Sequence, residues 1–130
     1  MHGSDPAVEH YGIDVSRRGQ GDASFVTASM TVGPEMVNSH GVCHGGLLFL
    51  LADAVMDYTT NGPLPDDQVA FAAHAEIDYV RAAMVDDDLT ATGERVGQWG
   101  RTGLVDVTIT NQRNETVAHF RGRTRTVPKR

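Results

Sequence analysis

Residues 38–58 read NSHGVCHGGLLFLLADAVMDY, and the second half of this stretch is almost entirely apolar apart from one carboxylate, Asp53. The apolar segment is longer than a typical strand, and Gly62-Pro63 is a strong helix stop, so we predict a helix over 46–60. Apolar side chains on nearly every side are typical of a buried central helix. The stretch therefore predicts that the rest of the chain folds around this helix.

Segments on both sides of the predicted helix alternate in the way that β-strands do. One segment precedes the helix at 24–32, and four follow it at 69–79, 89–96, 104–110 and 116–127. The turns expected between the last four are 85–88, 97–100 and 111–115. One helix followed by a strand meander predicts an α+β architecture, in which a curved antiparallel sheet wraps around the helix.

The strand expected directly after the helix, 69–79, is predicted to have one apolar and one polar face. The polar face is expected to carry His74, Glu76 and Asp78. The apolar face is expected to carry Val69, Phe71, Ala73, Ala75, Ile77 and Tyr79. We also expect this strand to be a free edge of the sheet, which invites pairing with a second copy of the chain.

Composition limits the class of protein. The 130 residues suit a single domain over 1–130, in which we expect 1–12 to be a loosely attached N-terminal segment. No apolar run approaches the ~20 residues of a membrane span, and no signal peptide is visible. A single cysteine, Cys43, excludes an intrachain disulfide, and the net charge of -6 argues against nucleic-acid binding. We therefore expect a cytoplasmic protein without a membrane or nucleic-acid partner.

Asp53 is an unusual residue for the middle of an apolar helix, because burying an unpaired carboxylate costs several kcal/mol. Its helical neighbours four residues away, Phe49 and Asp57, offer no positive charge. One interpretation is that Asp53 lies on the one exposed stripe of the helix. The other is that it is a reactive group, since acids in unfavourable surroundings are candidates for functional sites.

Gly45 and Gly46 precede the apolar run, and they suit either an ordinary turn or a helix start with accessible amide N–H groups. Such amides can stabilise a developing oxyanion. Eight residues separate Gly45 from Asp53, which is ~12 Å along a helix, so one small carbonyl group cannot contact both. If both act in one reaction, two subunits must contribute to each site.

Two further groups of residues suggest binding. His40 and His44 have the spacing of some zinc ligands, but no acidic residue lies between them, so we expect no metal site; Cys43 beside His44 is interpreted as a buried thiol. Six basic residues and one acid follow position 112, a local positive surplus that suits an anionic ligand. Three of these residues share one side of the last strand and are either a solvated face or a phosphate site; they are Arg121, Arg123 and Arg125.

The extended stretch NSHGVCHGGLLFLLADAVMDYTTN resembles the hotdog-fold acyl-CoA thioesterases of the phenylacetic-acid-degradation (PaaI-type) family. The resemblance rests on Asn38, on HGG at 44–46, and on Asp53 nine residues past His44. It continues through EIDYVRAAMVDDDLTATGERV and GRTGLVDVTITNQRNETVAHFRGRTR, and it covers roughly 10–127. It implies a long helix wrapped by an antiparallel sheet, in dimers that pair edge to edge and in many members form tetramers.

The resemblance also implies roles for the residues singled out above. Asp53 would attack the thioester carbonyl of an aryl-acetyl-CoA or similar acyl-CoA, or activate a water, without a metal or other cofactor. The amide of Gly45 in the partner subunit would polarise that carbonyl, with Gly46 beside it. Asn38 would position the water or the acid, and His44 would shape the loop that presents Gly45. The arginines would hold the phosphates of coenzyme A.

One departure from the family pattern keeps two other functions open. Some relatives have Ser or Thr near the acid on the strand after the helix, where this chain has Ala72 or Ala73. The absence of that hydroxyl keeps an alternative function open, that of a non-catalytic acyl-CoA-binding protein. A hotdog enoyl-CoA hydratase is disfavoured, because the Asp/His pair of such enzymes is not seen.

Overall fold

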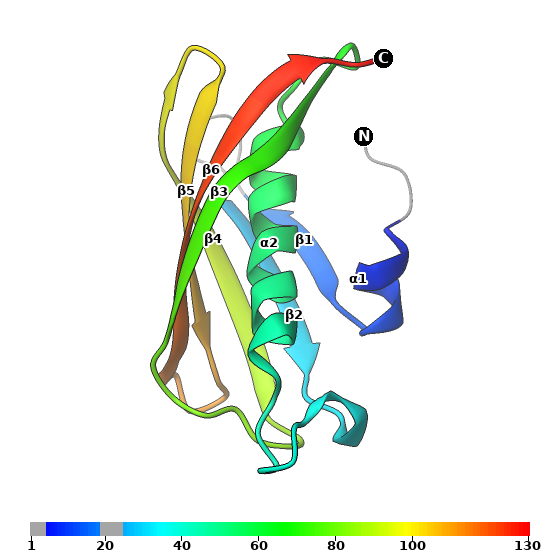
Figure 1. The fold of residues 1–130 in the computed structure, drawn as a ribbon, viewed down its shortest axis with the longest axis vertical. Coiled ribbons are helices and arrows are strands. Elements are labelled where there is room, and N and C mark those ends of the chain that lie inside the picture. The colour runs from blue at the N-terminus through cyan, green and yellow to red at the C-terminus, as the bar shows by residue number, and fades with distance from the viewer. Residues whose placement is uncertain (1–4, 19–24) are drawn as a thin grey trace.

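A computed structural model describes residues 5–18 and 25–130, which form two α-helices, a 3-10 turn and six strands (Figure 1). The elements are α1 (Pro6–His10), β1 (Asp14–Arg18), β2 (Phe25–Thr31), η2 (Pro34–Met36), α2 (Gly45–Asn61), β3 (Gln68–Tyr79), β4 (Asp88–Trp99), β5 (Thr102–Thr110) and β6 (Thr116–Pro128). Residues 1–4 of the predicted N-terminal segment and residue 24 of the first predicted strand lie outside the described residues.

All strand pairs are antiparallel, and the sheet order is β1-β2-β4-β5-β6-β3. Figure 1 shows α2 running along the inner face of this curved sheet. The predicted architecture, one long helix wrapped by an antiparallel sheet, is confirmed. The prediction that the strand after the helix is a free edge is also confirmed, because β3 pairs only with β6 among the described strands.

The core lies between α2 and the inner face of the sheet. Leu51 and Val55 of α2 are fully buried, as is Phe120 of β6. The ring of Phe120 meets that of Phe49 edge to face, with centroids 5.2 Å apart. The helix is therefore held by side chains on several of its sides, as its apolar composition predicts.

Asn61 joins the end of α2 to the start of β3. Its Oδ1 accepts a hydrogen bond from the Ala70 amide at 2.8 Å, and its Nδ2 donates to the Ala70 carbonyl at 3.0 Å. The side chain thus satisfies both backbone groups of Ala70, as a neighbouring strand would. This contact fixes where the edge strand begins relative to the helix.

The two faces predicted for β3 are wrong in the first half of the strand, because its side chains do not alternate regularly along its whole length. The register with β6 shifts between Ala72 and His74, which is a β-bulge. Phe71 lies opposite Arg125 and is 61% exposed, whereas Ile77 lies opposite the buried Phe120. Residues that lie opposite each other on paired strands point to the same face of the sheet. The bulge therefore changes which β3 side chains face the helix, from even-numbered residues before it to odd-numbered residues after it. Val69 and Phe71 therefore do not share a face with Ala75, Ile77 and Tyr79.

Two smaller differences concern the N-terminus and one turn. Within the segment that we expected to be loosely attached, residues 6–10 form α1, and its Val8 is buried in the core. Strand β1, which the sequence did not predict, extends the sheet beyond β2. The turn predicted at 97–100 begins later, because β4 continues to Trp99 and Gly100 adopts a φ of +60° that suits glycine.

The contact between β6 and α2 gives a prediction about stability. A Cβ atom at Gly122 would overlap the Sδ atom of buried Met56, so Gly122→Ala should lower the free energy of unfolding by about 1–3 kcal/mol. Urea denaturation measures this change. In a Met56→Ala background the same substitution should be much less damaging, and an equal loss in both backgrounds would contradict the packing explanation.

Candidate active site

The loop before α2 is fixed by hydrogen bonds to backbone groups. Oδ1 of Asn38 accepts from the amides of His40 (2.9 Å) and Val42 (3.2 Å). The amide of His44, the N-cap residue of α2, donates to the Met36 carbonyl at 2.9 Å. Asn38 and His44 therefore hold the chain that leads into Gly45, and both lie at the N-terminal end of α2.

The amides of Gly45 and Gly46 point out of the first turn of α2 without an acceptor. The carbonyl of His44 accepts from Leu47 and Leu48, but no hydrogen bond from the N–H of either glycine occurs within the described residues. A cavity of about 380 Å³ adjoins Gly45, with Leu48 and Tyr79 in its wall. Free N–H groups at the positive end of a helix, next to a cavity, are suited to bind an oxygen that carries negative charge.

Asp53 is half-buried and lines a second cavity, of about 190 Å³, together with Asp57, Ala72 and Thr124. It forms no ion pair or hydrogen bond within the described part of the chain. Burial raises the pKa of Asp53 above its usual value, and the nearby carboxylates of Asp57 and then Asp5 raise it further. Asp53 thus lies beside a cavity, as a site residue would, and not on a fully exposed stripe.

Asp57 and Ala72 bear on two of the expectations. Asp57 is partly exposed near the end of α2, as predicted, and its Oδ1 accepts a hydrogen bond from Asn61 at 2.7 Å. Ala72 lines the Asp53 cavity, so the strand after the helix supplies no hydroxyl at this position. Ala73 lies in the bulge.

The two cavities have no lining residue in common, so one chain does not bring Asp53 and Gly45 together. The separation follows from the helix itself, because eight residues correspond to ~12 Å. A reacting carbonyl group in contact with both would need them from different copies of the chain.

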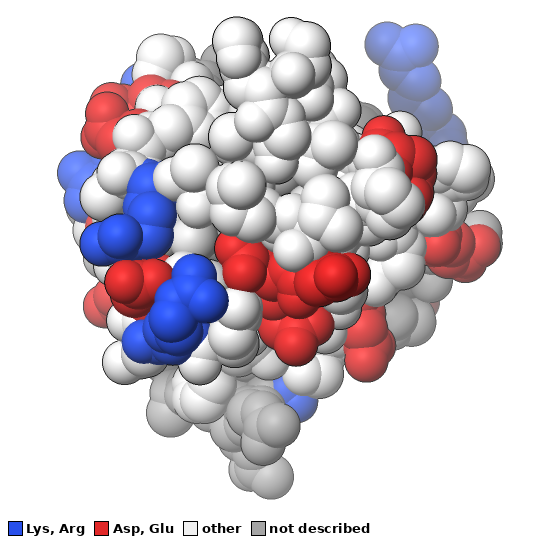
Figure 2. Space-filling model, turned by 90° about the horizontal axis from the view of Figure 1, so that it is seen from below, with Lys and Arg blue, Asp and Glu red and all other residues white. Residues whose placement is uncertain are grey.

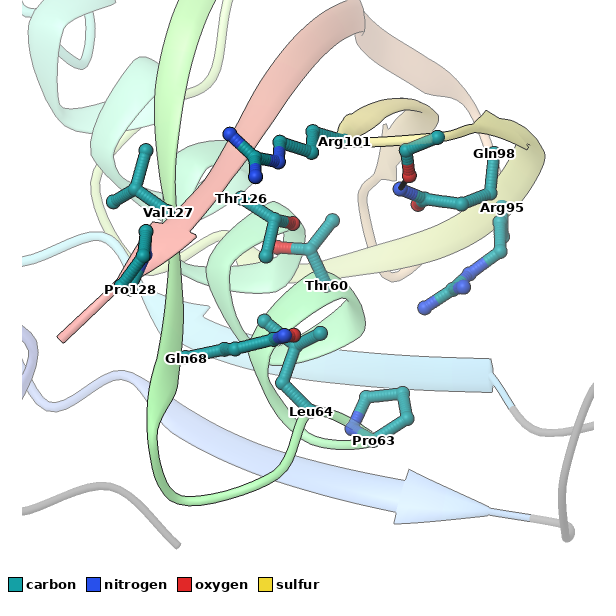
Figure 3. A pocket seen from close by; sticks show the side chains of 11 residues that line it. Thr60, Pro63, Leu64, Gln68, Arg95, Gln98, Arg101, Thr126, Val127 and Pro128 are labelled. Carbon is teal, nitrogen blue, oxygen red and sulfur yellow. Dashed lines mark hydrogen bonds between the residues drawn. The ribbon is translucent and has the colours of Figure 1, made fainter.

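A third cavity, of about 410 Å³, lies at the C-terminal end of α2 (Figure 3). Arg95, Gln98 and Arg101 of the β4–β5 hairpin line it, facing Thr60 and Thr126. Arg95 donates to the Thr59 carbonyl at 3.0 Å, which satisfies one of the last carbonyls of the helix. Neither Asp53 nor Gly45 lines this cavity.

Arg121, Arg123 and Arg125 lie together on the outer face of the sheet, as their spacing predicts. Arg121 binds Asp106 through two hydrogen bonds of 2.6 and 2.9 Å, which hold the pKa of the Asp106 carboxyl below its usual value. Asp53 is on the opposite, helix-facing side of the sheet. One chain therefore does not bring the arginines to Asp53, and their role in phosphate binding stays a prediction.

The end of the molecule at which α2 begins carries charges of both signs. Figure 2 views this end from below and shows acidic side chains gathered near its middle, with basic side chains to one side. In the turns here Arg113 pairs with Glu115 at 2.9 Å and approaches Asp87 at 3.9 Å. This end of the molecule is thus not a uniformly basic surface.

The remaining candidates are at the start of α2. His40 and His44 are exposed, and the described residues contain no group of three or more potential metal ligands from His, Cys, Asp and Glu. Cys43 is buried, as predicted, and its burial raises the pKa of the thiol to about 11, which disfavours a thiolate nucleophile. No helix within the described ranges is long and apolar enough to cross a membrane.

Sequence reasoning missed two residues of these cavities. Asp5 lies beside Asp53, although it belongs to the segment that we expected to be loose. Tyr79 contacts Gly45 across 34 residues of sequence, and no local pattern distinguishes it from the other apolar residues of its strand.

Comparisons with known proteins agree with this fold. Residues 40–118 match the model of the thioesterase superfamily. The acyl-coenzyme A thioesterase PaaI of Escherichia coli K12 is 38% identical over 123 residues, which is 95% of this chain and 84% of that protein.

Solved structures give the same result. The structure of the E. coli PaaI protein from the phenylacetic acid degradation operon superposes with a TM-score of 0.85 at 37% identity, covering 95% of this chain and 85% of that one. The Streptococcus mutans UA159 protein smu.793, solved bound to acetyl-CoA, has a TM-score of 0.76 at 25% identity, covering 90% and 91%.

A sheet wrapped around a helix that begins with HGG, together with these matches, defines a hotdog-fold thioester hydrolase. The chain belongs to the thioesterase superfamily and, within it, to the PaaI-type acyl-CoA thioesterases.

The raised pKa of Asp53 gives a prediction about stability. The folded state binds the Asp53 proton more tightly than the unfolded state, so the ionised carboxylate destabilises the fold above the raised pKa. Asp53→Asn should therefore raise Tm at pH 7.5, by about 2–5 °C. The gain should shrink as the pH falls through the raised pKa toward ~3.9, the unfolded value.

Calorimetry at several pH values measures this difference. Asp78→Asn, on the exposed outer face of β3, is the matched control and should leave Tm nearly unchanged. A Tm for Asp53→Asn equal to or below that of the wild type at pH 7.5 would contradict the electrostatic interpretation.

Proposed function

We propose that the chain hydrolyses the thioester of an aryl-acetyl-CoA or a similar acyl-CoA at sites shared between two subunits. One observation carries this proposal: the helix-start amides and the half-buried carboxylate border separate cavities at opposite ends of β3. Because β3 is a free edge, a second copy can join the two halves.

The edge strand has the geometry that such a dimer requires. Ala72, near the start of β3, lines the Asp53 cavity, whereas Tyr79, at its end, lines the Gly45 cavity. If two β3 strands pair antiparallel about a twofold axis near Ala75, the Asp53 cavity of each subunit meets the Gly45 cavity of its partner. Exposed apolar side chains on this edge strand and directly after it support such pairing; they are Phe71, Tyr79 and Val80.

In the proposed reaction the thioester oxygen accepts hydrogen bonds from the Gly45 amide, with Gly46 beside it, as negative charge develops. The Asp53 carboxylate of the other subunit acts by one of two routes. As a general base it takes a proton from water while the water oxygen attacks the carbonyl carbon, and coenzyme A leaves as a thiolate. As a nucleophile it forms a mixed anhydride with loss of the thiolate, and water then hydrolyses the anhydride.

The remaining residues have supporting roles in this proposal. His44 and Asn38 hold the loop before Gly45 through the bonds described above, and Asn38 lies at the end that would face the partner's Asp53, where it positions water or the acid. Arg121, Arg123 and Arg125 are proposed to hold the phosphates of coenzyme A. Their place on the outer face requires that the phosphates be reached around the sheet edge or from a further dimer, as in a tetramer.

Two observations support the substrate class. Apolar side chains such as Val8, Leu50 and Met56 line the Asp53 cavity, and its size of about 190 Å³ suits a ring-bearing acyl group. The similarity to E. coli PaaI and to a protein bound to acetyl-CoA favours an acyl-CoA substrate.

One observation favours a second candidate function, a protein that binds acyl-CoA without hydrolysing it. Ala72, on the strand after the helix, lines the Asp53 cavity and has no hydroxyl group.

Removing the carboxylate distinguishes these candidates. Asp53→Ala should lower kcat at least about 100-fold, because it removes the base or nucleophile. Release of free thiol from a panel of acyl-CoAs measures the rates, and calorimetry with the same compounds measures binding. Wild-type kcat in Asp53→Ala would contradict the proposed mechanism, and tight binding without hydrolysis by the wild type would favour the non-catalytic protein.

Mixing two inactive variants tests whether sites are shared. Asp53→Ala and Gly45→Ala should each be inactive alone, the latter because a Cβ at Gly45 would lie 2.8 Å from the Tyr79 ring. A mixed dimer restores one intact site of two, so equal amounts after subunit exchange should recover about a quarter of wild-type activity. Each variant carried alone through the same exchange procedure is the control and should stay inactive. No recovery despite proven exchange would exclude shared sites.

A further inference from the structure

Tyr79 is the last residue of β3, and it contacts the first residue of α2 in two ways. Its Oη donates a hydrogen bond of 2.9 Å to the carbonyl oxygen of Gly45. Its ring also lies where a side chain at position 45 would be, because an added Cβ would be 2.8 Å from both Cζ and Oη. A side chain at position 45 would therefore have to displace the tyrosine.

The hydrogen bond from Tyr79 acts on one peptide group of the helix start. The carbonyl of Gly45 and the N–H of Gly46 belong to the same peptide, and this N–H has no acceptor within the described residues. A carbonyl oxygen has two lone pairs, so it accepts from Tyr79 as well as from the fourth residue along the helix. Hydrogen bonds at a carbonyl polarise the peptide and make its N–H a stronger donor.

The space around Gly46 allows a ligand to use this N–H. Gly46 is exposed, and a Cβ there would meet nothing within 4 Å. Tyr79 lines the same cavity as Gly45, so the hydroxyl, the polarised peptide and the cavity adjoin one another.

We propose that Tyr79 is a positioning residue of the thioesterase site, which orients the Gly45–Gly46 peptide and strengthens the Gly46 N–H as a second donor to the thioester oxygen. This inference rests on the proposed function, in which the Gly45 amide is the first donor. It makes the oxyanion site a pair of successive amides, and it gives the edge strand a direct part in catalysis. Two donors hold the tetrahedral oxygen in one orientation more firmly than a single donor does.

The test removes the hydroxyl and keeps the ring. Tyr79→Phe should lower kcat about 3–10-fold and leave KM nearly unchanged, because the affected bond strengthens only as charge develops on the oxygen. Tm should change little, since the substitution keeps the ring and removes only one hydrogen bond, the one to the Gly45 carbonyl. The amide proton of Gly46 should move upfield in a nitrogen–proton NMR spectrum, which a merely structural role of the hydroxyl elsewhere would not cause.

A double-mutant cycle shows whether the effect passes through Gly46. Gly46→Pro removes the N–H at a first-turn position where proline is tolerated, and Gly46→Ala keeps it. The Tyr79→Phe loss should persist beside Gly46→Ala and disappear beside Gly46→Pro. If Gly46→Pro does not fold, the kcat and NMR measurements on Tyr79→Phe decide alone.

The outcomes separate this inference from the proposed function. Wild-type kcat in Tyr79→Phe, or a loss confined to KM or Tm, overturns the role of Tyr79 even when Asp53→Ala is inactive. Full activity in Asp53→Ala instead overturns the proposed mechanism, whatever Tyr79→Phe does.

Discussion

Helix α2 has apolar side chains on nearly all sides, so a flat layer cannot cover it. The sheet covers it by curving, and α1 adds Val8 from the opposite side. This cover is incomplete, because Leu47, Phe49 and Leu50 stay only partly buried. The two cavities beside the helix and the exposed edge of β3 are therefore consequences of one constraint: a helix too apolar for the chain to bury alone.

The same incomplete cover explains how Asp53 is tolerated. A fully buried carboxylate without partners would destabilise the fold, and a fully exposed one would have the pKa of an ordinary surface acid. Half-burial beside Asp57 raises the pKa of Asp53 while leaving room for water and a ligand. If Asp53 acts as proposed, stability and reactivity are opposed at this position.

The features that the sequence predicted are those set within one element. The helix, predicted over 46–60, extends from Gly45 to Asn61, because length and the Gly-Pro stop are local signals. The separation of Gly45 from Asp53 needed only the helical rise. The bulge escaped prediction because a run of small apolar residues around Ala72 alternates equally well in either register, and the Tyr79–Gly45 contact escaped because it joins distant parts of the chain.

The bulge in β3 gives the two ends of this strand different parity. Even-numbered residues such as Ala70 and Ala72 face the helix at the Asp53 end, and odd-numbered residues such as Ile77 and Tyr79 do so at the Gly45 end. One extra residue thus reverses which side chains face the helix between the first and second halves of the strand. Substitutions in one half therefore need not alter the other, so the Asp53 cavity and the Gly45 cavity can vary separately, although one continuous strand lines both.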